Sequence, residues 1–148
     1  MSELSHVNKA GDVRMVDVGD KPLSRRRAVA RAIVRMAPET AGRLRALPKG
    51  DALVTAQVAG IMAAKRTSEL IPLCHPLSLS SVEVSLAVGD AGVEIVATVE
   101  TTAQTGVEME ALTAVSVAGL TVYDMAKAVD KTLAVTDVML VEKSKEPA

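Results

Sequence analysis

Between Ser24 and Met36 the chain follows a two-residue repeat that restricts its backbone to an extended form. The even positions from 28 to 36 are all apolar, whereas four odd positions from 25 to 35 are arginines. This period of two predicts a β-strand with one covered face and one basic face, although the alanine content alone would also permit a helix. We therefore expect a sheet with one face covered by other elements.

The remainder of the chain alternates between helical and strand patterns. Pro38 suits the first turn of a helix, and Asp51 is placed to cap the next one. The expected elements after the first strand are a helix from 38 to about 47, a helix over 52–66, strands over 77–88 and 93–102, a helix over 107–129 and a strand over 132–142. This order predicts an α+β fold of the ferredoxin-like split β-α-β type, a four-stranded antiparallel sheet with helices on one face.

A chain of 148 residues leaves little room for a second domain. Residues 1–23 are polar and contain glycines, so we expect a mobile N-terminal arm with one extended piece at 13–18. Residues 24–143 are expected to form a single domain, and residues 144–148 a frayed tail. The second face of the sheet has many apolar or small side chains, which predicts self-association.

The composition excludes several classes of function. The chain has one tyrosine, no phenylalanine and no tryptophan, which argues against a reader of single-stranded nucleic acid, and its net charge of -1 shows no basic excess. Its single cysteine excludes an internal disulfide and a multi-cysteine metal site. No apolar run approaches the roughly 20 residues that span a bilayer, and no secretory signal is evident. We therefore expect a cytoplasmic protein that binds neither membranes nor nucleic acids.

The long helix carries the most informative polar residues. Asp124 and Lys127 are three positions apart and can pair directly. Two interpretations are open. The two residues form either an ordinary surface ion pair or a carboxylate and an amine tuned for proton transfer. At 100° per residue, Glu110 lies in the same sector of the helix as Asp124 and Lys127. Its place in the first turn does not explain this alignment.

The loop Ile71–Pro76 holds Cys74 and His75 between two prolines, which exclude regular structure. A histidine there is either a structural residue or part of a site, and the cysteine fits a small buried side chain better than a nucleophile. Adjacent residues rarely chelate one metal, so no metal site is predicted. Lys49, just before a helix, is a weak signal for an anion, as are Lys65 and the arginines at 25–27.

Several sequence segments taken together identify a family far more specifically than these single residues. The string Leu70-Ile71-Pro72-Leu73-Cys74-His75-Pro76-Leu77 closely resembles the MoaC family, the cyclic pyranopterin monophosphate synthases. The other segments that carry the resemblance are 6–8, 15–18, 49–51, 59–67, 105–113 and 120–127. The resemblance runs almost from end to end.

The resemblance implies an enzyme of the first stage of molybdenum cofactor biosynthesis. It would convert 3′,8-cyclo-7,8-dihydro-GTP into cyclic pyranopterin monophosphate and release pyrophosphate, without a required cofactor, although a divalent cation could accompany the triphosphate. The substrate would come from a separate radical iron–sulfur enzyme. The family is also a homohexamer, a trimer of dimers with active sites at subunit interfaces.

The resemblance further implies roles for particular residues. Asp124, Lys127 and Lys49 would form the acid–base centre, with no assignment of each proton. The residues expected to line the substrate site are Leu73, Cys74, His75, Glu108, Met109 and Glu110. Arg26, from a neighbouring subunit, would hold the triphosphate with Lys65 and Lys143. Two alternatives remain: a non-catalytic binding module, in which Asp124 and Lys127 are exposed and dispensable, and a different nucleotide phosphate lyase.

Overall fold

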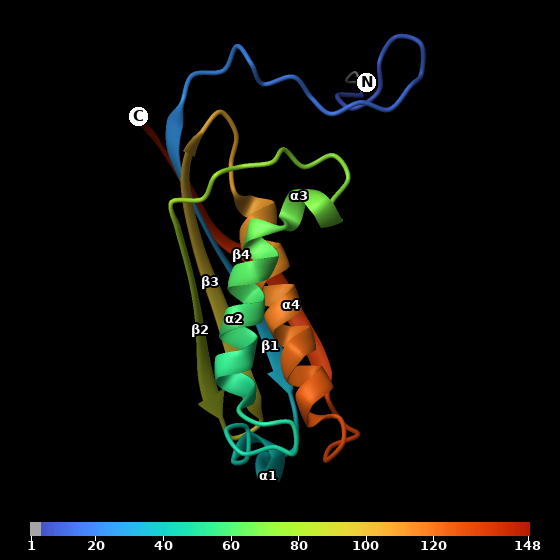
Figure 1. Cartoon of the computed structure of the whole chain (residues 1–148), viewed down its shortest axis with the longest axis vertical. Helices are drawn as coiled ribbons and strands as arrows, with labels where there is room; N and C mark the ends of the chain where they lie inside the picture. Colours follow the sequence, from blue (N-terminus) through green and yellow to red (C-terminus); the bar gives the residue numbers. More distant parts are fainter. Residues whose placement is uncertain (1–3) are drawn as a thin grey trace.

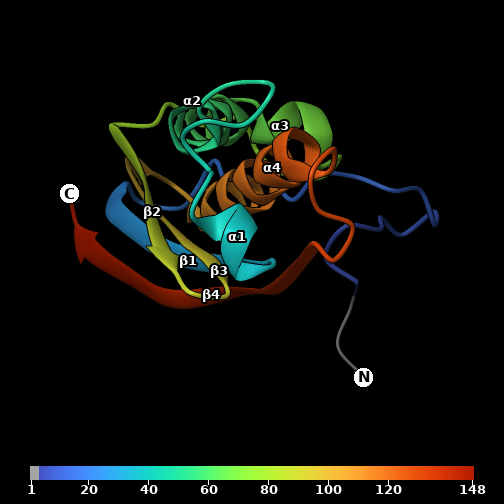
Figure 2. The same ribbon diagram turned by 90° about the horizontal axis from the view of Figure 1, so that it is seen from below.

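β1 (Ser24–Arg35) lies inside a four-stranded antiparallel sheet in the computed structural model, which describes residues 4–148. The other elements are α1 (Pro38–Ala41), α2 (Ala52–Lys65), α3 (Thr67–Leu70), β2 (Ser81–Gly89), β3 (Gly92–Ala103), α4 (Glu108–Ala126) and β4 (Ala134–Pro147). The strand order is β2-β3-β1-β4, and α2 and α4 lie side by side on one face (Figures 1 and 2). The predicted α+β fold, an antiparallel sheet with helices on one face, is confirmed.

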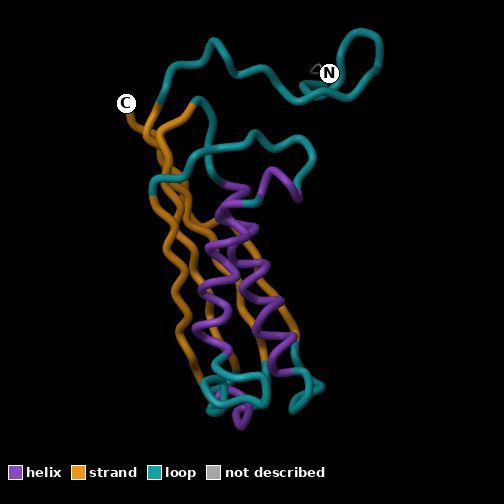
Figure 3. Tube along the Cα trace, viewed as in Figure 1, coloured by secondary structure: helices purple, strands orange, loops and turns teal. Residues whose placement is uncertain are grey.

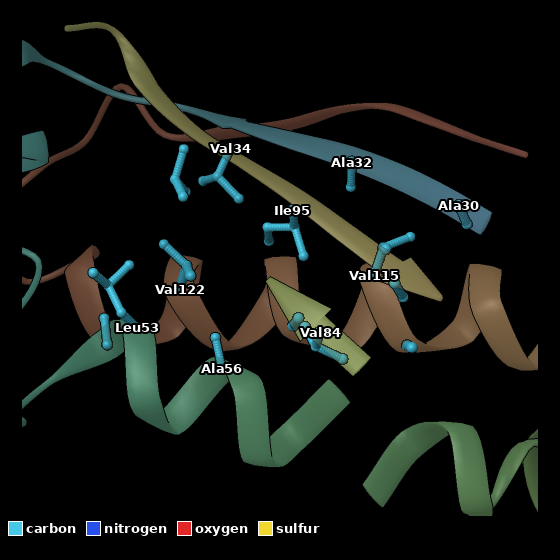
Figure 4. Packing of buried hydrophobic residues seen from close by; sticks show 14 of the residues in the cluster. Ala30, Ala32, Val34, Leu53, Ala56, Val84, Ile95, Val115 and Val122 are labelled. Carbon is cyan, nitrogen blue, oxygen red and sulfur yellow. The ribbon is translucent and has the colours of Figure 1, made fainter. Parts of the chain in front are cut away.

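The alternation in β1 has the predicted structural meaning. Ala28, Ala30, Ala32 and Val34 are all fully buried on the side that faces the helices. There they pack with aliphatic side chains from β3, α2 and α4, among them Ile95, Leu53 and Val122 (Figure 4). Small side chains let the two long helices approach closely: a Cβ added at Gly60 of α2 would lie 3.1 Å from the carbonyl oxygen of Ala114 in α4. A core without aromatic rings is thus filled by close approach of its elements.

Two helix boundaries differ from prediction for identifiable reasons. The cap of α2 is confirmed, because the Asp51 carboxylate accepts hydrogen bonds from the amides of Leu53 and Val54 at 2.9 and 3.2 Å. The helix expected to reach Leu47 ends at Ala41, however, and the chain continues in turns to a paired bridge between Leu47 and Gly50. Gly50 allows this turn through a positive φ of 115°.

The long helix ends at Ala126, three residues before its predicted end at Val129. The Asp130 side chain explains the stop, because it accepts hydrogen bonds from the amide of Ala37 and the hydroxyl of Thr40, at 3.0 and 2.7 Å. These bonds hold the chain after α4 against the start of α1. The third strand is within one residue of its predicted range at each end, whereas the second begins at Ser81, four residues after its predicted start. The loop at 71–76 is irregular as expected (Figure 3).

The final strand is longer than predicted, and residues 144–147 do not fray. β4 continues to Pro147, which pairs with Ser24 of β1, and Arg25 of β1 pairs with Glu146 at 2.8 Å. Pairing with a distant strand therefore orders a segment whose own sequence is polar. In the arm, Val13 forms only an isolated bridge with Val7, and no strand covers the expected piece at 13–18.

The second sheet face is more polar than predicted. Arg27 lies between Glu100 of β3 and Glu142 of β4, at 3.6 and 2.7 Å, and Arg31 pairs with Glu94 at 2.9 Å. These cross-strand ion pairs give the arginines of β1 local partners, so they occupy much of the face that was expected to be apolar. No helix between residues 4 and 148 is long and apolar enough to cross a bilayer.

Candidate active site

A cluster of three charged residues lies at the C-terminal end of α4. The Asp124 carboxylate binds the Lys49 amine at 2.8 Å and the Lys127 amine at 3.2 Å. Lys49 reaches it from the turn before α2, and Lys127 directly follows the last turn of α4. The hydrogen bond from Lys49, followed by that from Lys127, lowers the pKa of Asp124. The three residues predicted as an acid–base centre are thus in contact, with a carboxylate that stays ionised between two amines.

A cavity of about 400 Å³ lies at the opposite, N-terminal end of α4. The loop after α3 and the first turn of α4 contribute much of its wall, together with the turn that precedes α4 and the N-terminal arm. All six residues predicted for the substrate site line it: Leu73, Cys74, His75, Glu108, Met109 and Glu110. The irregular loop at 71–76 therefore positions its side chains over the start of α4.

Glu110 has the most unusual environment in this cavity. The residue is only 3% exposed, and burial raises the pKa of its carboxyl group. The Cys74 thiol lies 3.6 Å from one carboxylate oxygen and donates to it, while the other oxygen has no partner among residues 4–148. Burial, together with the charge of Glu110, raises the pKa of Cys74 to about 11. A raised pKa disfavours the thiolate, which is the form of cysteine that acts as a nucleophile.

The three cations predicted to hold a triphosphate lie near one another in the fold but not in one cavity. Arg26 lines a cavity of about 210 Å³ with hydroxyl side chains that include Ser80 and Ser144, and its Nε is buried without a partner in the described chain. Lys65 lines a second cavity, which also includes Ser80, so the two cavities adjoin. Lys143 precedes Ser144 on β4 and is exposed.

One chain does not bring the whole predicted set together. Glu110 and Asp124 share a sector of α4, as the helical geometry predicts, but they are fourteen residues apart. At 1.5 Å per residue this separates them by about 21 Å along the helix axis. The acid–base cluster is also open, with the side chains of Asp124 and Lys127 54% and 56% exposed. The shared sector therefore does not make one site within a single chain.

Sequence reasoning missed part of the cavity wall. His6, Val16, Val18 and Lys21 of the N-terminal arm also line the cavity at the start of α4. The His75 ring is in hydrogen-bond contact with the backbone carbonyl of Val16. No local pattern predicts this long-range contact. No group of three metal-ligating side chains (His, Cys, Asp or Glu) occurs in the described part of the chain.

The chain is similar to known proteins over nearly its whole length. The profile of the MoaC family matches residues 15–146. A cyclic pyranopterin monophosphate synthase from Syntrophomonas wolfei is 56% identical over 144 residues, covering 95% of this chain and 92% of the relative. Relatives of the same name from Roseiflexus castenholzii and Streptomyces avermitilis are 58% and 59% identical, covering 97% and 95% of this chain and 94% and 84% of their own. Since this similarity includes both ends of α4 and the loop around His75, the chain belongs to the MoaC family.

Proposed function

We propose that the chain converts 3′,8-cyclo-7,8-dihydro-GTP into cyclic pyranopterin monophosphate and pyrophosphate, as a cyclic pyranopterin monophosphate synthase of molybdenum cofactor biosynthesis. The observation that carries the proposal is the contact of Asp124 with two lysines in a chain that is 56–59% identical to relatives of that name. The reaction needs proton transfers and a phosphoryl transfer. Both kinds of chemistry have matching side chains here.

The proton transfers are assigned to Asp124, Lys127 and Lys49. Opening a guanine-derived ring and closing it as a pterin requires groups that deliver and remove protons at fixed positions. The two amines share one carboxylate, at 2.8 and 3.2 Å, so either can give up a proton while the carboxylate holds the other in place. The six residues around the cavity at the start of α4 would bind the ring of the substrate.

The phosphoryl transfer is assigned to the basic residues near the start of β1. When a hydroxyl group attacks the α-phosphate and pyrophosphate leaves, cations must balance the developing negative charge. Arg26 supports this role, because its buried Nε has no partner among residues 4–148 and the residue lines a cavity whose wall combines arginines, hydroxyl side chains and the carboxylates of Glu100 and Glu146. Lys65 and Lys143 complete the set. A divalent cation, where one takes part, would bind the phosphate oxygens of the substrate.

The complete site is assigned to an interface between subunits of a homohexamer, a trimer of dimers. The separation of Glu110 from Asp124 by about 21 Å supports this, because a second chain can supply the end of α4 that the first lacks. Exposed apolar side chains on the outer surfaces of the helices also support it, since association would bury them. They are Val54, Val58 and Met62 of α2 and Leu120 and Tyr123 of α4.

The substrate is a product of radical chemistry that this chain is not equipped to perform. Its single cysteine cannot hold an iron–sulfur cluster within one chain, so the supply of cyclo-dihydro-GTP is assigned to a separate radical iron–sulfur cyclase. We place both steps in the cytoplasm, the compartment of GTP.

The decisive test is incubation of the purified protein with enzymatically made cyclo-dihydro-GTP, followed by detection of the pterin and of pyrophosphate. Both products are expected in equal amounts. Pyrophosphate without the pterin would indicate a different phosphate lyase, and neither product would indicate a non-catalytic binding module. That module predicts an exposed Asp124 as well, so exposure alone does not decide between them.

A further inference from the structure

The N-terminal arm, residues 4–23, lies over the cavity at the start of α4. In Figure 1 it crosses the end of the molecule where α3 lies and α4 begins. It is tied to the domain by the side-chain amide of Gln104, which donates to the carbonyl of Gly19 at 3.1 Å. Its own loop is held by the Asn8 side chain, which accepts from the amides of Ala10 and Asp12. Hydrogen bonds within the arm, and one to Gln104, therefore hold the arm beside the cavity.

Two backbone carbonyls of the arm determine where two histidines carry their protons. Nε2 of His75 contacts the carbonyl oxygen of Val16, and Nδ1 of His6 lies 2.9 Å from the carbonyl oxygen of Arg14. A carbonyl oxygen can only accept a hydrogen bond, so each of these nitrogens must carry a hydrogen. In a neutral ring the other nitrogen is then an acceptor. The two rings consequently adopt opposite tautomers.

The remaining ring nitrogens are free for a ligand. Neither Nδ1 of His75 nor Nε2 of His6 has a hydrogen-bond partner among residues 4–148. Both rings line the same cavity as Glu108 and Glu110, whose side chains add further acceptor oxygens. An acceptor-rich cavity fits a ligand edge that carries N–H donors, such as the amino group and ring N–H of a guanine-derived base. Lys21 on the same wall can bind an anion, but the two free ring nitrogens and the glutamate oxygens disfavour a phosphate chain, which also offers only acceptors.

We propose that the arm is a functional part of the substrate cavity, because its backbone carbonyls hold His75 as the Nε2–H tautomer and His6 as the Nδ1–H tautomer. The free nitrogen of each ring then accepts a hydrogen bond from an N–H donor of the substrate ring. The identity of the ligand rests on the proposed function, whereas the tautomers do not. Val16 and Gln104 act through His75 and are positioning residues. His6 becomes a second contact to the ring, although it is 69 residues from His75.

The tautomers can be read directly from full-length protein labelled with ¹⁵N-histidine. The chain has only two histidines, so His6→Gln assigns both sets of signals. The ¹⁵N chemical shift separates protonated from unprotonated ring nitrogens, and the measurement is made at a pH where the rings are neutral. We expect His75 to be protonated at Nε2 alone and His6 at Nδ1 alone. Protonation of His75 at Nδ1, or a mixture of tautomers in either ring, would overturn the proposal.

The coupling between arm and cavity is tested by Gln104→Leu, with Gln57→Leu as its matched control. Each glutamine donates Nε2 to a backbone carbonyl at 3.1 Å, Gln104 to the arm and Gln57 to Val84 of β2. Loss of one such bond costs about 1 kcal/mol, or about fivefold in an equilibrium. Gln104→Leu should therefore mix the tautomers of His75 and raise KM about fivefold with little change in kcat, and Gln57→Leu should do neither. An unchanged His75 tautomer in folded Gln104→Leu would show that the arm does not set it.

These readouts separate the two proposals. Opposite tautomers in a protein that does not turn over cyclo-dihydro-GTP would support the proposed role of the arm but refute the proposed function. Mixed tautomers in an active enzyme would refute the role of the arm alone. Because the wild-type measurement needs no variant beyond the assignment, a folding defect in Gln104→Leu does not prevent the test.

Discussion

The two ends of α4 each present a carboxyl group, and their environments shift the two pKa values in opposite directions. Glu110, in the first turn, is 3% exposed, and burial raises its pKa. The side chain of Asp124, in the last turn, is 54% exposed, and Lys49 and Lys127 lower its pKa. Oppositely shifted carboxyl groups are characteristic of sites that divide acid and base roles. Environment, more than residue type, decides what each group can do.

The helix dipole would predict the reverse pattern. The positive N-terminal end of a helix favours an ionised Glu110, and the negative C-terminal end disfavours an ionised Asp124. Both observed directions oppose it, so burial at one end and two direct amine contacts at the other are the stronger effects. Close, specific contacts therefore outweigh the general field of the helix, and each end can be altered separately by substitution.

The largest effect is expected at the charged end. Asp124→Asn keeps the shape of the side chain but removes the ionisable group, so it should lower kcat by about a thousandfold or more, within the range of positioned acid–base groups. Thermal unfolding should be nearly unchanged, because the side chain is exposed. Steady-state kinetics and a melting curve check both. Asp90→Asn, in the turn between β2 and β3, is the control, and equal activity of the two variants would contradict the assignment.

The next effect divides the basic residues. Lys127→Ala should lower kcat by at least about a hundredfold with binding largely intact. Arg26→Ala should instead raise KM about tenfold and do so more strongly at low salt, because a group that only holds phosphate acts on ground and transition states alike. Initial rates at two ionic strengths measure both.

Mixing these two variants tests whether the site is shared. At substrate concentrations below the wild-type KM, Lys127→Ala and Arg26→Ala chains should both have low activity. Hybrid oligomers of the two contain some interfaces with both intact residues, so their activity should exceed that of the unmixed variants. Subunit exchange is verified by mass. Exchanged hybrids without any recovered activity would rule out a site between chains.

A smaller effect is expected at the buried end. Glu110→Gln preserves the volume and one acceptor oxygen but removes the acid, so KM should rise about tenfold, the cost of one hydrogen bond to a charged group. The variant should be at least as stable as wild type at neutral pH, because it no longer buries an ionisable group. Isothermal titration with the substrate and thermal unfolding provide the readouts. A large loss of stability would show that Glu110 is mainly structural.

The smallest effect concerns the pH dependence of stability, where the two ends should have opposite signs. A raised pKa favours the folded state below the ordinary value of 4.5 for Glu110, and this advantage is lost as the pH rises through the raised value. A lowered pKa favours the folded state above the ordinary value of 3.8 for Asp124, and it is lost as the pH falls. Relative to wild type, the Tm of Glu110→Gln should therefore rise with increasing pH, and that of Asp124→Asn should fall. The change should be small for the exposed Asp124 and larger for the buried Glu110, and slopes of the same sign for both variants would contradict the comparison.

Local patterns in the sequence predicted the parts of the molecule that depend on neighbours in the chain. The alternation in β1, the Asp51 cap and the pair of Asp124 with Lys127 all involve residues a few positions apart. The length of β4 could not be predicted, because its polar end is ordered by pairing with β1 more than a hundred residues away. The basic face of β1 was predicted, but its ion-pair partners were not, since Glu100 and Glu142 come from other strands.

The candidate site shows the same division. The resemblance selected six residues that do line one cavity. The predicted helix over 107–129 already placed Glu110 and Asp124 near its two ends, but their shared sector suggested one site, which a single chain does not form. The contact of His75 with Val16 spans 59 residues and involves a backbone carbonyl, which has no signature in the side-chain sequence. Local periodicity predicts elements and pairs, whereas the walls of a cavity depend on how distant segments fold back.

The position of Tyr123 makes the protein a natural fluorescence probe of its own assembly. It is the only tyrosine in a chain without tryptophan, it precedes Asp124, and it is 41% exposed on the outer surface of α4. All intrinsic emission from the chain therefore originates beside the acid–base cluster. Covering of this surface by another subunit should change the intensity and anisotropy of that emission, without any label. The ultraviolet background is also low enough for a pterin product to be followed in the same cuvette.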